Sequence, residues 1–188
     1  MSEKLDKIKN NILKNKNLPL YQGKNKLVFG EGKSDADIIF IGEAPGAEEE
    51  KQNKPFCGRA GQILNKLFNS INLSREDVYI TNIVKFRPPN NRKPKQSEIE
   101  AYASYLDKQI QIINPDIIVC LGNTACQYIF NKYNLSDKLS GISKIHGKIF
   151  KADDLKIIPF YHPAVAVYNF IELKKLKKDF KILKKTKA

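Results

Sequence analysis

Three short polar segments of this sequence combine residue types that suit recognition of a flat ligand with hydrogen-bonding edges. Gly42-Glu43-Ala44-Pro45-Gly46 supplies a tight turn, one carboxylate, and glycines that let a ligand approach the backbone. Asn82 ends an apolar run, and its paired donor and acceptor fit the edge of a pyrimidine. His162 follows another apolar run and precedes a proline. A lone histidine is more often structural, but this one lies beyond a predicted strand, as the other two segments do, which favours a role in a site.

Phe56 is an aromatic residue between two turn signals, Pro55 and Gly58, ahead of a helical pattern. Rings in such places commonly pack in the core. At the mouth of a pocket, however, a ring can stack on a nucleobase, which contributes about 1–3 kcal/mol per base. The residue types around Phe56 leave both roles open.

The elements that position these residues follow from four apolar runs. Because the runs are apolar almost throughout, rather than at alternate positions, we expect strands buried on both faces. Helical patterns lie between them, which favours an α/β fold with a parallel sheet covered on both sides. In such a sheet, ligands bind beyond the carboxyl ends of the strands, and the three polar segments lie just after the cores of three of the strands. The predicted strands are Asp37–Ile41, Val78–Val84, Asp116–Leu121 and Lys156–Phe160.

Length and composition suit one globular domain. The chain has 188 residues, 41% of them hydrophobic, and we expect residues 1–188 to form a single domain. Helical spacing predicts an N-terminal helix at about residues 3–15 and a lysine-rich C-terminal helix at about 164–186. No apolar run reaches the roughly 18 residues of a membrane span, and the N-terminus lacks the features of a signal peptide. We therefore expect a cytoplasmic monomer that does not associate with membranes.

The formal net charge of +13 favours a polyanionic partner such as DNA. Part of this charge lies in the tail 170–188, which carries eight lysines against two acidic residues. Apolar residues recur there at helical spacing, so an amphipathic helix is predicted. Its lysines are either a solvated face or a DNA contact, and the sequence does not decide between them.

Four motifs, GEAPG, KPFCGRAG, TNIVKFRPPNNRKP and YHPA, resemble in order and spacing those of the family-four uracil-DNA glycosylases. The similarity extends over roughly 18–169. It implies a three-layer α/β/α fold with a short, mostly parallel, four-stranded sheet. The implied activity is monofunctional hydrolysis of uracil from DNA, single-stranded and possibly double-stranded, which leaves an abasic site for base-excision repair.

The resemblance also assigns roles to residues. Glu43 and His162 would be catalytic, Glu43 near the sugar and the attacking water and His162 as hydrogen-bond donor to uracil O2. Phe56 would stack on the base, Asn82 would read its Watson–Crick edge, and Glu49 would crowd C5 and reject thymine. The full set of expected uracil-binding residues is Gly42, Glu43, Ala44, Glu49, Phe56, Asn82 and His162. Basic residues that border the motifs are expected to hold DNA phosphates: Arg59, Lys85, Arg87, Arg92 and Lys148.

The chain departs from the family at two places. Most members hold a four-iron cluster on four cysteines, whereas the matching positions here are Asn15, Leu18, Phe86 and Tyr102. Thiolates hold such clusters, so we expect no iron–sulfur cofactor and no other metal, with Leu18, Phe86 and Tyr102 filling the volume. After His162 the usual bulky leucines and arginine are replaced by smaller residues and a tyrosine, 166–168, which puts activity on double strands in doubt.

Two other functions remain alternatives at this point. One is a DNA-binding module that keeps the glycosylase fold without cleaving, and the other is a glycosylase for another deaminated base such as hypoxanthine. The presence of Glu43, Phe56, Asn82 and His162 together favours the enzyme, because a binding module needs no such complete set.

Overall fold

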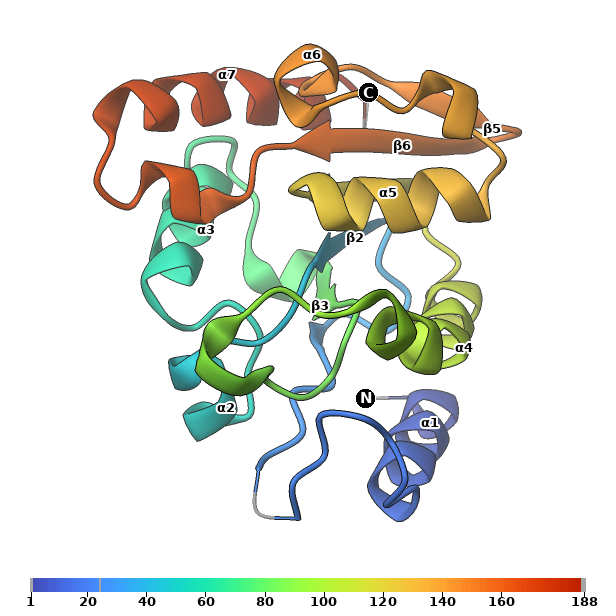
Figure 1. The fold of residues 1–188 in the computed structure, drawn as a ribbon. Helices are drawn as coiled ribbons and strands as arrows, with labels where there is room; N and C mark the ends of the chain where they lie inside the picture. The colour runs from blue at the N-terminus through green and yellow to red at the C-terminus, as the bar shows by residue number, and fades with distance from the viewer. Residues whose placement is uncertain (1, 24, 187–188) are drawn as a thin grey trace.

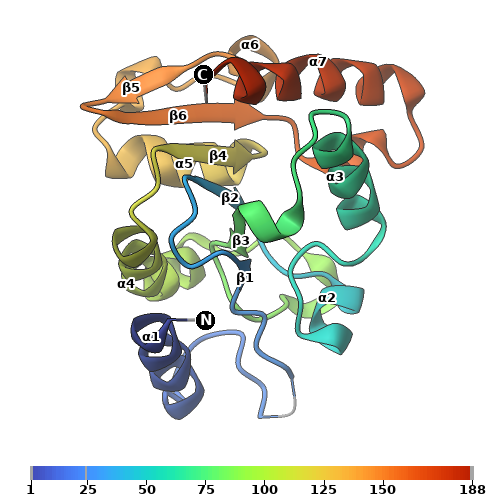
Figure 2. The ribbon, with the colours of Figure 1, turned by 180° about the vertical axis from the view of Figure 1, so that it is seen from behind.

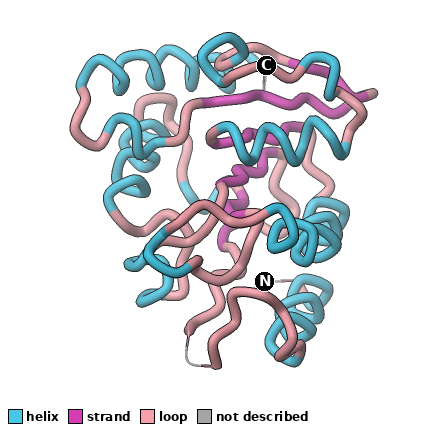
Figure 3. The backbone as a smooth tube through the Cα atoms, viewed as in Figure 1, coloured by secondary structure: helices cyan, strands magenta, loops and turns pink. Residues whose placement is uncertain are grey.

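A computed structural model describes residues 2–23 and 25–186 and shows a central β-sheet with helices on both sides. Within these residues the sheet has six strands in the order β1-β3-β2-β4-β6-β5. Its four central strands are parallel and confirm the four predicted ones. Figure 3 shows the strands in magenta between the helices. They are β2 (Ile38–Gly42), β3 (Tyr79–Asn82), β4 (Ile117–Leu121) and β6 (Leu155–Phe160).

The prediction of a four-stranded sheet is wrong, because two short antiparallel strands extend it at its edges. Strand β1 (Glu31–Gly32) pairs with β3, and β5 (Phe150–Ala152) pairs with β6. Both are only partly buried and have no run of apolar residues. The hydrophobic signal that revealed the central strands is therefore missing from them.

The helices form a layer on each face of the sheet (Figures 1 and 2). Helices α1, α4 and α5 contribute to the hydrophobic core on one face, and α3 and α7 to the core on the other. Among the described residues, no helix is long and apolar enough to cross a lipid bilayer. The helices are α1 (Glu3–Lys14), α2 (Ala47–Gln52), α3 (Arg59–Asn69), α4 (Gln96–Ile113), α5 (Asn123–Lys132), α6 (Ile142–Ile145) and α7 (Phe170–Thr186). Short 3-10 turns are η1 (Arg75–Asp77), η2 (Pro89–Asn91), η3 (Ser136–Lys138) and η4 (Pro163–Ala166).

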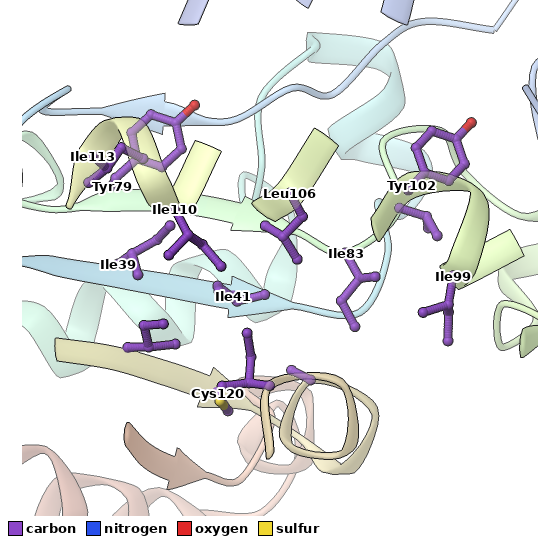
Figure 4. Packing of buried hydrophobic residues seen from close by; sticks show 14 of the residues in the cluster. Ile39, Ile41, Tyr79, Ile83, Ile99, Tyr102, Leu106, Ile110, Ile113 and Cys120 are labelled. Atoms are coloured by element: carbon purple, nitrogen blue, oxygen red, sulfur yellow. The ribbon is translucent and has the colours of Figure 1, made fainter. Parts of the chain in front are cut away.

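Strand β2 shows why the central strands are apolar throughout. Ile39 and Ile41 point toward α4, where Ile110 and its neighbours cover them (Figure 4). Phe40 points to the opposite face and packs edge-on against Phe68 of α3, with 4.9 Å between the ring centroids. Successive side chains thus enter two different cores, and both cores need apolar residues.

The C-terminal helix begins later than predicted, at Phe170 rather than at about residue 164. Pro163–Ala166 instead forms the short turn η4. The side chain of Asn169 accepts the N–H groups of Ile171 at 3.0 Å and Glu172 at 3.3 Å, as an N-cap does. The predicted amphipathic character is confirmed, because the buried apolar residues of α7 are Leu176, Phe180 and Leu183.

Candidate functional site

A cavity of about 600 Å³ opens at the carboxyl ends of the parallel strands, within the size range of small-ligand pockets. Its walls come from the segments after β2, β3 and β6 and from the first turn of α5. The sequence prediction that these segments meet is therefore confirmed. Six of the predicted base-binding residues line the cavity: Glu43, Ala44, Glu49, Phe56, Asn82 and His162.

Gly42, the seventh predicted residue, supports the pocket from behind. A Cβ atom at this position would lie 2.6 Å from Cζ of Phe56 and 2.4 Å from Oδ1 of Asn82. Such distances are impossible for real Cβ atoms, so glycine is what allows the ring and the amide to sit against the end of β2. The ring of Phe56 is almost completely covered by protein and lies 5.5 Å, centroid to centroid, from that of His162.

Asn82 presents an unsatisfied acceptor to the cavity. The residue ends β3, is 1% exposed, and its Oδ1 has no hydrogen-bond partner among the described residues. A buried polar atom without a partner costs about 1–3 kcal/mol. A ligand that brings an N–H group to Oδ1 would remove this cost, so Asn82 is suited to reading a donor on a flat base.

His162 is held as a neutral imidazole. Its Nδ1 accepts the backbone N–H of Ala164 at 3.2 Å, which leaves the ring proton on Nε2. Burial of the ring lowers its pKa to about 4, an effect that the negative charge of Glu49 opposes. At neutral pH the half-buried ring therefore offers one fixed N–H donor at the wall of the cavity.

Glu43 is oriented by a residue that the sequence analysis did not select. The hydroxyl of Thr124, in the first turn of α5, donates to Oε2 of Glu43. Both side chains line the cavity. Thr124 follows the carboxyl end of β4 just as the three polar segments follow the other parallel strands, and this position was the signal that would have identified it.

Glu49 connects two loops of the site. Its Oε2 accepts the N–H of Gly46 at 3.1 Å, and its Oε1 accepts the N–H of Gly58 at 2.8 Å. The carboxylate thus holds the start of α2 against the loop that carries Phe56. Its expected contact with C5 of a base stays a prediction, whereas its place in the cavity wall agrees with that role.

The prediction that Lys85 binds DNA phosphates is wrong, because its side chain is buried. Its side chain is 0% exposed, and its Nζ donates to Oγ1 of Thr81 and to the backbone oxygen of Asn82, both at 2.7 Å. Desolvation lowers the pKa of this amine well below the ordinary value for lysine. A basic residue beside a motif is typical of a surface charge, but the chain just after β3 is buried.

Replacing Lys85 by methionine tests the state of this buried amine. Because the folded-state pKa of Lys85 lies below the unfolded one, the unfolded chain binds more protons than the folded protein between these two values. Relative to Lys85→Met, the wild-type free energy of unfolding should therefore rise with pH up to about 10.4, the pKa of free lysine. Urea unfolding of both proteins across this range measures the difference. A difference that does not change with pH would mean that Lys85 is charged in the folded state.

The other four predicted phosphate-binding residues lie at or near the surface, in different settings. Arg92 lines the cavity, but two hydrogen bonds of 2.8 and 2.5 Å tie it to the carboxylate of Glu98. Arg87 is similarly paired with Glu50 at 3.3 Å. Arg59 and Lys148 are exposed. Further basic residues at the cavity include Lys93, which the sequence analysis did not select.

Of the four positions that match cluster cysteines, three are buried and Asn15 is exposed. Leu18, Phe86 and Tyr102 all belong to one buried hydrophobic cluster, as predicted, and the rings of Phe86 and Tyr102 lie 6.4 Å apart. The hydroxyl of Tyr102 donates to the backbone oxygen of Pro19 at 2.5 Å. Asn15 lies at the end of α1 and donates to the hydroxyl of Tyr105 at 3.2 Å. These side chains do not fit an iron–sulfur cluster, because they offer it no thiolate and their rings occupy the interior.

The chain is similar to known proteins over most of its length. A family model described as "Uracil DNA glycosylase superfamily" matches residues 29–184. The chain is similar to the type-4 uracil-DNA glycosylase of Sulfurisphaera tokodaii, with 45% identity that covers 95% of this chain and 83% of the relative. It is 42% identical to the type-4 uracil-DNA glycosylase of Archaeoglobus fulgidus, over 95% of this chain and 91% of the relative. For the protein of the same name from Saccharolobus solfataricus, identity is 44% over 97% of this chain and 86% of the relative.

Proposed function

Because this chain belongs to the uracil DNA glycosylase superfamily, we propose that its pocket binds uracil flipped out of DNA and hydrolyses the bond between the base and deoxyribose. The enzyme is a uracil-DNA glycosylase, a hydrolase of DNA repair. The observation that carries the pocket assignment is that Oδ1 of Asn82 has no hydrogen-bond partner within residues 2–23 and 25–186. It fits the N3–H group of uracil, which cytosine lacks, so the same atom rejects the normal base from which uracil arises.

Leaving-group stabilisation is the main task of the site. Glycosidic cleavage passes through an oxocarbenium-like state in which the departing base becomes negative. In the proposed complex Nε2–H of His162 donates to O2 of uracil, and the Asn82 amide pairs with N3–H and O4. These contacts strengthen as charge develops, so they stabilise the transition state more than the bound substrate.

The flipped base also needs an apolar support. Extrusion from the stack costs a few kcal/mol, and stacking on the ring of Phe56 offsets part of it. The carboxylate of Glu43, which the hydroxyl of Thr124 orients, is placed to hold the water that attacks the sugar. Ala44 leaves no second carboxylate at that point of the turn. Thymine shares the N3 edge with uracil, and we assign its rejection to Glu49 at the cavity wall.

A strand-break assay tests this function. Labelled single-stranded oligonucleotides that carry one uracil, hypoxanthine or thymine are incubated with the protein, and abasic sites are then cleaved with alkali. Breaks at uracil, and none at thymine, are the expected result. Breaks at hypoxanthine alone would assign another deaminated base to the pocket, and tight binding without breaks at any base would point to a binding module.

We also propose that the enzyme needs no iron–sulfur cluster. The support is the set of side chains at the four family ligand positions, where aromatic packing and hydrogen bonds occupy the site. Protein purified without oxygen is expected to excise uracil while containing no stoichiometric iron and showing no visible absorbance. Iron in a fixed ratio to protein, lost together with activity on chelation, would contradict the proposal.

The residues after His162, which would face the DNA, differ from one another in exposure. Ala166 is buried and cannot enter DNA, whereas Tyr168 is 83% exposed, with the guanidinium of Arg59 5.6 Å from its ring centroid. We propose that single strands are cleaved readily and that Tyr168 supports cleavage of duplexes by stacking in the gap left by uracil. Tyr168→Ala should lower the rate on duplex DNA by about 5- to 100-fold, the effect of one lost stacking contact. The rate on single strands should stay near the wild-type value, and equal losses on both substrates would refute this role.

A further inference from the structure

The backbone of Phe56 has a conformation that needs support. Its φ is +49°, in the left-handed region, which is strained for any residue other than glycine. Conformations of this kind persist only where surrounding contacts hold them. Phe56 carries the ring that forms one wall of the cavity, so the contacts that hold its backbone also set the position of the ring.

Arg75 provides these contacts from behind the loop. One nitrogen of its guanidinium donates to the backbone oxygen of Pro55 at 2.7 Å, and the other terminal nitrogen to that of Phe56 at 3.1 Å. The remaining N–H groups go to Oδ1 of Asn65 at 3.0 Å and to Oε1 of Glu31, the latter from both Nε and Nη2. All five donors of the guanidinium are thereby used. The side chain is fixed in one orientation as a result.

Glu31 anchors the arginine. It lies in β1, the edge strand that pairs with β3, and Nε of Arg75 is 2.9 Å from its Oε1. The two side chains are only 24% and 30% exposed, so their charges are partly shielded from water and interact more strongly than a surface pair. Strand β1 thus brings a counter-charge to the arginine that holds the pocket loop.

Two further contacts restrict the same loop. Glu49 accepts the N–H of Gly58, and Gly61 of α3 lies directly against the carbonyl of Phe56. A Cβ at Gly61 would come within 1.7 Å of that carbonyl oxygen. The loop is therefore held on the cavity side by Glu49, on the helix side by Gly61, and from behind by Arg75.

We propose that Arg75, anchored by Glu31, is a positioning residue that holds Phe56 in its left-handed conformation so that the ring can stack on the flipped base. Neither Arg75 nor Glu31 lines the cavity, so both act only through the loop. This inference rests on the proposed function, because it concerns the ring that supports uracil.

The contacts of Arg75 with Pro55, Phe56 and Asn65 depend on the shape of the guanidinium rather than on its charge. Lysine keeps the positive charge beside Glu31 but cannot donate at once to Pro55, Phe56 and Asn65 in the fixed geometry of the arginine fork. Both Arg75→Lys and Arg75→Met are therefore expected to lower the single-turnover excision rate by about 5- to 50-fold, most of the effect of one stacking contact. Full activity in Arg75→Lys would overturn the proposal.

A double-mutant cycle separates positioning from general stability. Each Arg75 variant is also made in a Phe56→Ala background, and single-turnover rates on a uracil-containing single strand are compared. If Arg75 acts through the ring, its replacement should change the rate of Phe56→Ala by less than about twofold, since coupled residues are non-additive. Equal losses in both backgrounds would show a general structural effect and overturn the proposal.

Two further variants complete the experiment. Glu31→Gln keeps the arginine but weakens its anchor, and it should give a smaller loss that also disappears in the Phe56→Ala background. If an Arg75 variant fails to fold, the rates of Glu31→Gln in the two backgrounds provide the test instead. Lys132→Met removes an ion pair with Asp107, 3.0 Å long and outside the cavity, and should keep the wild-type rate.

The assay of the wild-type protein comes first and separates a failure of the proposed function from a failure of the role of Arg75. A wild-type protein that excises no uracil would reject the proposed function and, with it, this inference. A wild-type protein that excises uracil, combined with additive losses in the cycle, would reject only the role of Arg75.

Discussion

Replacing His162 by alanine should lower the rate of uracil excision by about 100- to 1000-fold, the usual loss when one preorganised donor to a developing anion is removed. The imidazole is fixed by the N–H of Ala164, so its Nε2–H group points to one place and needs no reorganisation during the reaction. Single-turnover assays on a uracil-containing single strand measure the effect. The protein has only two histidines, and His146→Ala is the matched control, because His146 bonds to Asp179 of α7 instead of lining the cavity.

The pH dependence of this effect follows from the lowered pKa. Because the pKa of His162 is about 4, the ring stays neutral through pH 6.5, where an ordinary histidine would gain a proton. The ratio of the wild-type rate to that of His162→Ala should therefore stay constant from neutral pH to about pH 5. Below that it should fall, since protonation places a second N–H on Nδ1, facing the N–H of Ala164. A fall centred near pH 6.5 would contradict the neutral assignment.

The lowered pKa of His162 also predicts how the free energy of unfolding changes with pH. Between pH 6.5 and about 4 the unfolded chain binds a proton at His162 that the folded protein does not. Stability from this group is therefore present above pH 6.5 and declines as pH falls through that window. In urea unfolding, His162→Ala should lose less stability than the wild type over the same interval.

Replacing Asn82 by alanine should lower the excision rate by about 100-fold, since two hydrogen bonds to the base of about 1.5 kcal/mol each would be lost. Unlike most buried substitutions, it should leave thermal stability at the wild-type level or above. The reason is that Oδ1 of Asn82 is buried and finds no partner among the described residues, so its removal ends that cost.

The excision rate and the thermal unfolding of Asn82→Ala, measured on the same sample, check whether activity falls while stability does not. Asn69→Ala, at the exposed end of α3, is the matched control and should retain wild-type activity. A large loss of stability in Asn82→Ala would mean that the amide supports the fold. Loss of activity at unchanged stability would mean that it is kept for the substrate.

The residues that we propose to bind the base are largely visible in the sequence. The four central strands have apolar runs because both of their faces are buried, and polar residues stand out where those runs end. Parallel strands bring their carboxyl ends to one edge, so Glu43, Asn82 and His162 had to converge there. Phe56 was identified as a candidate from its turn signals and from the resemblance of its motif.

The sequence therefore predicts the four central strands and the edge at which their polar residues gather. It does not show that two short strands extend the sheet, that Lys85 is buried, that Thr124 orients Glu43, or that Arg75 reaches the loop of Phe56. The physical reason is that burial on two faces leaves a local pattern along the chain. A hydrogen bond between residues far apart in the sequence leaves no such pattern. The identity of a charged residue also does not show whether its side chain lies in water or in the core.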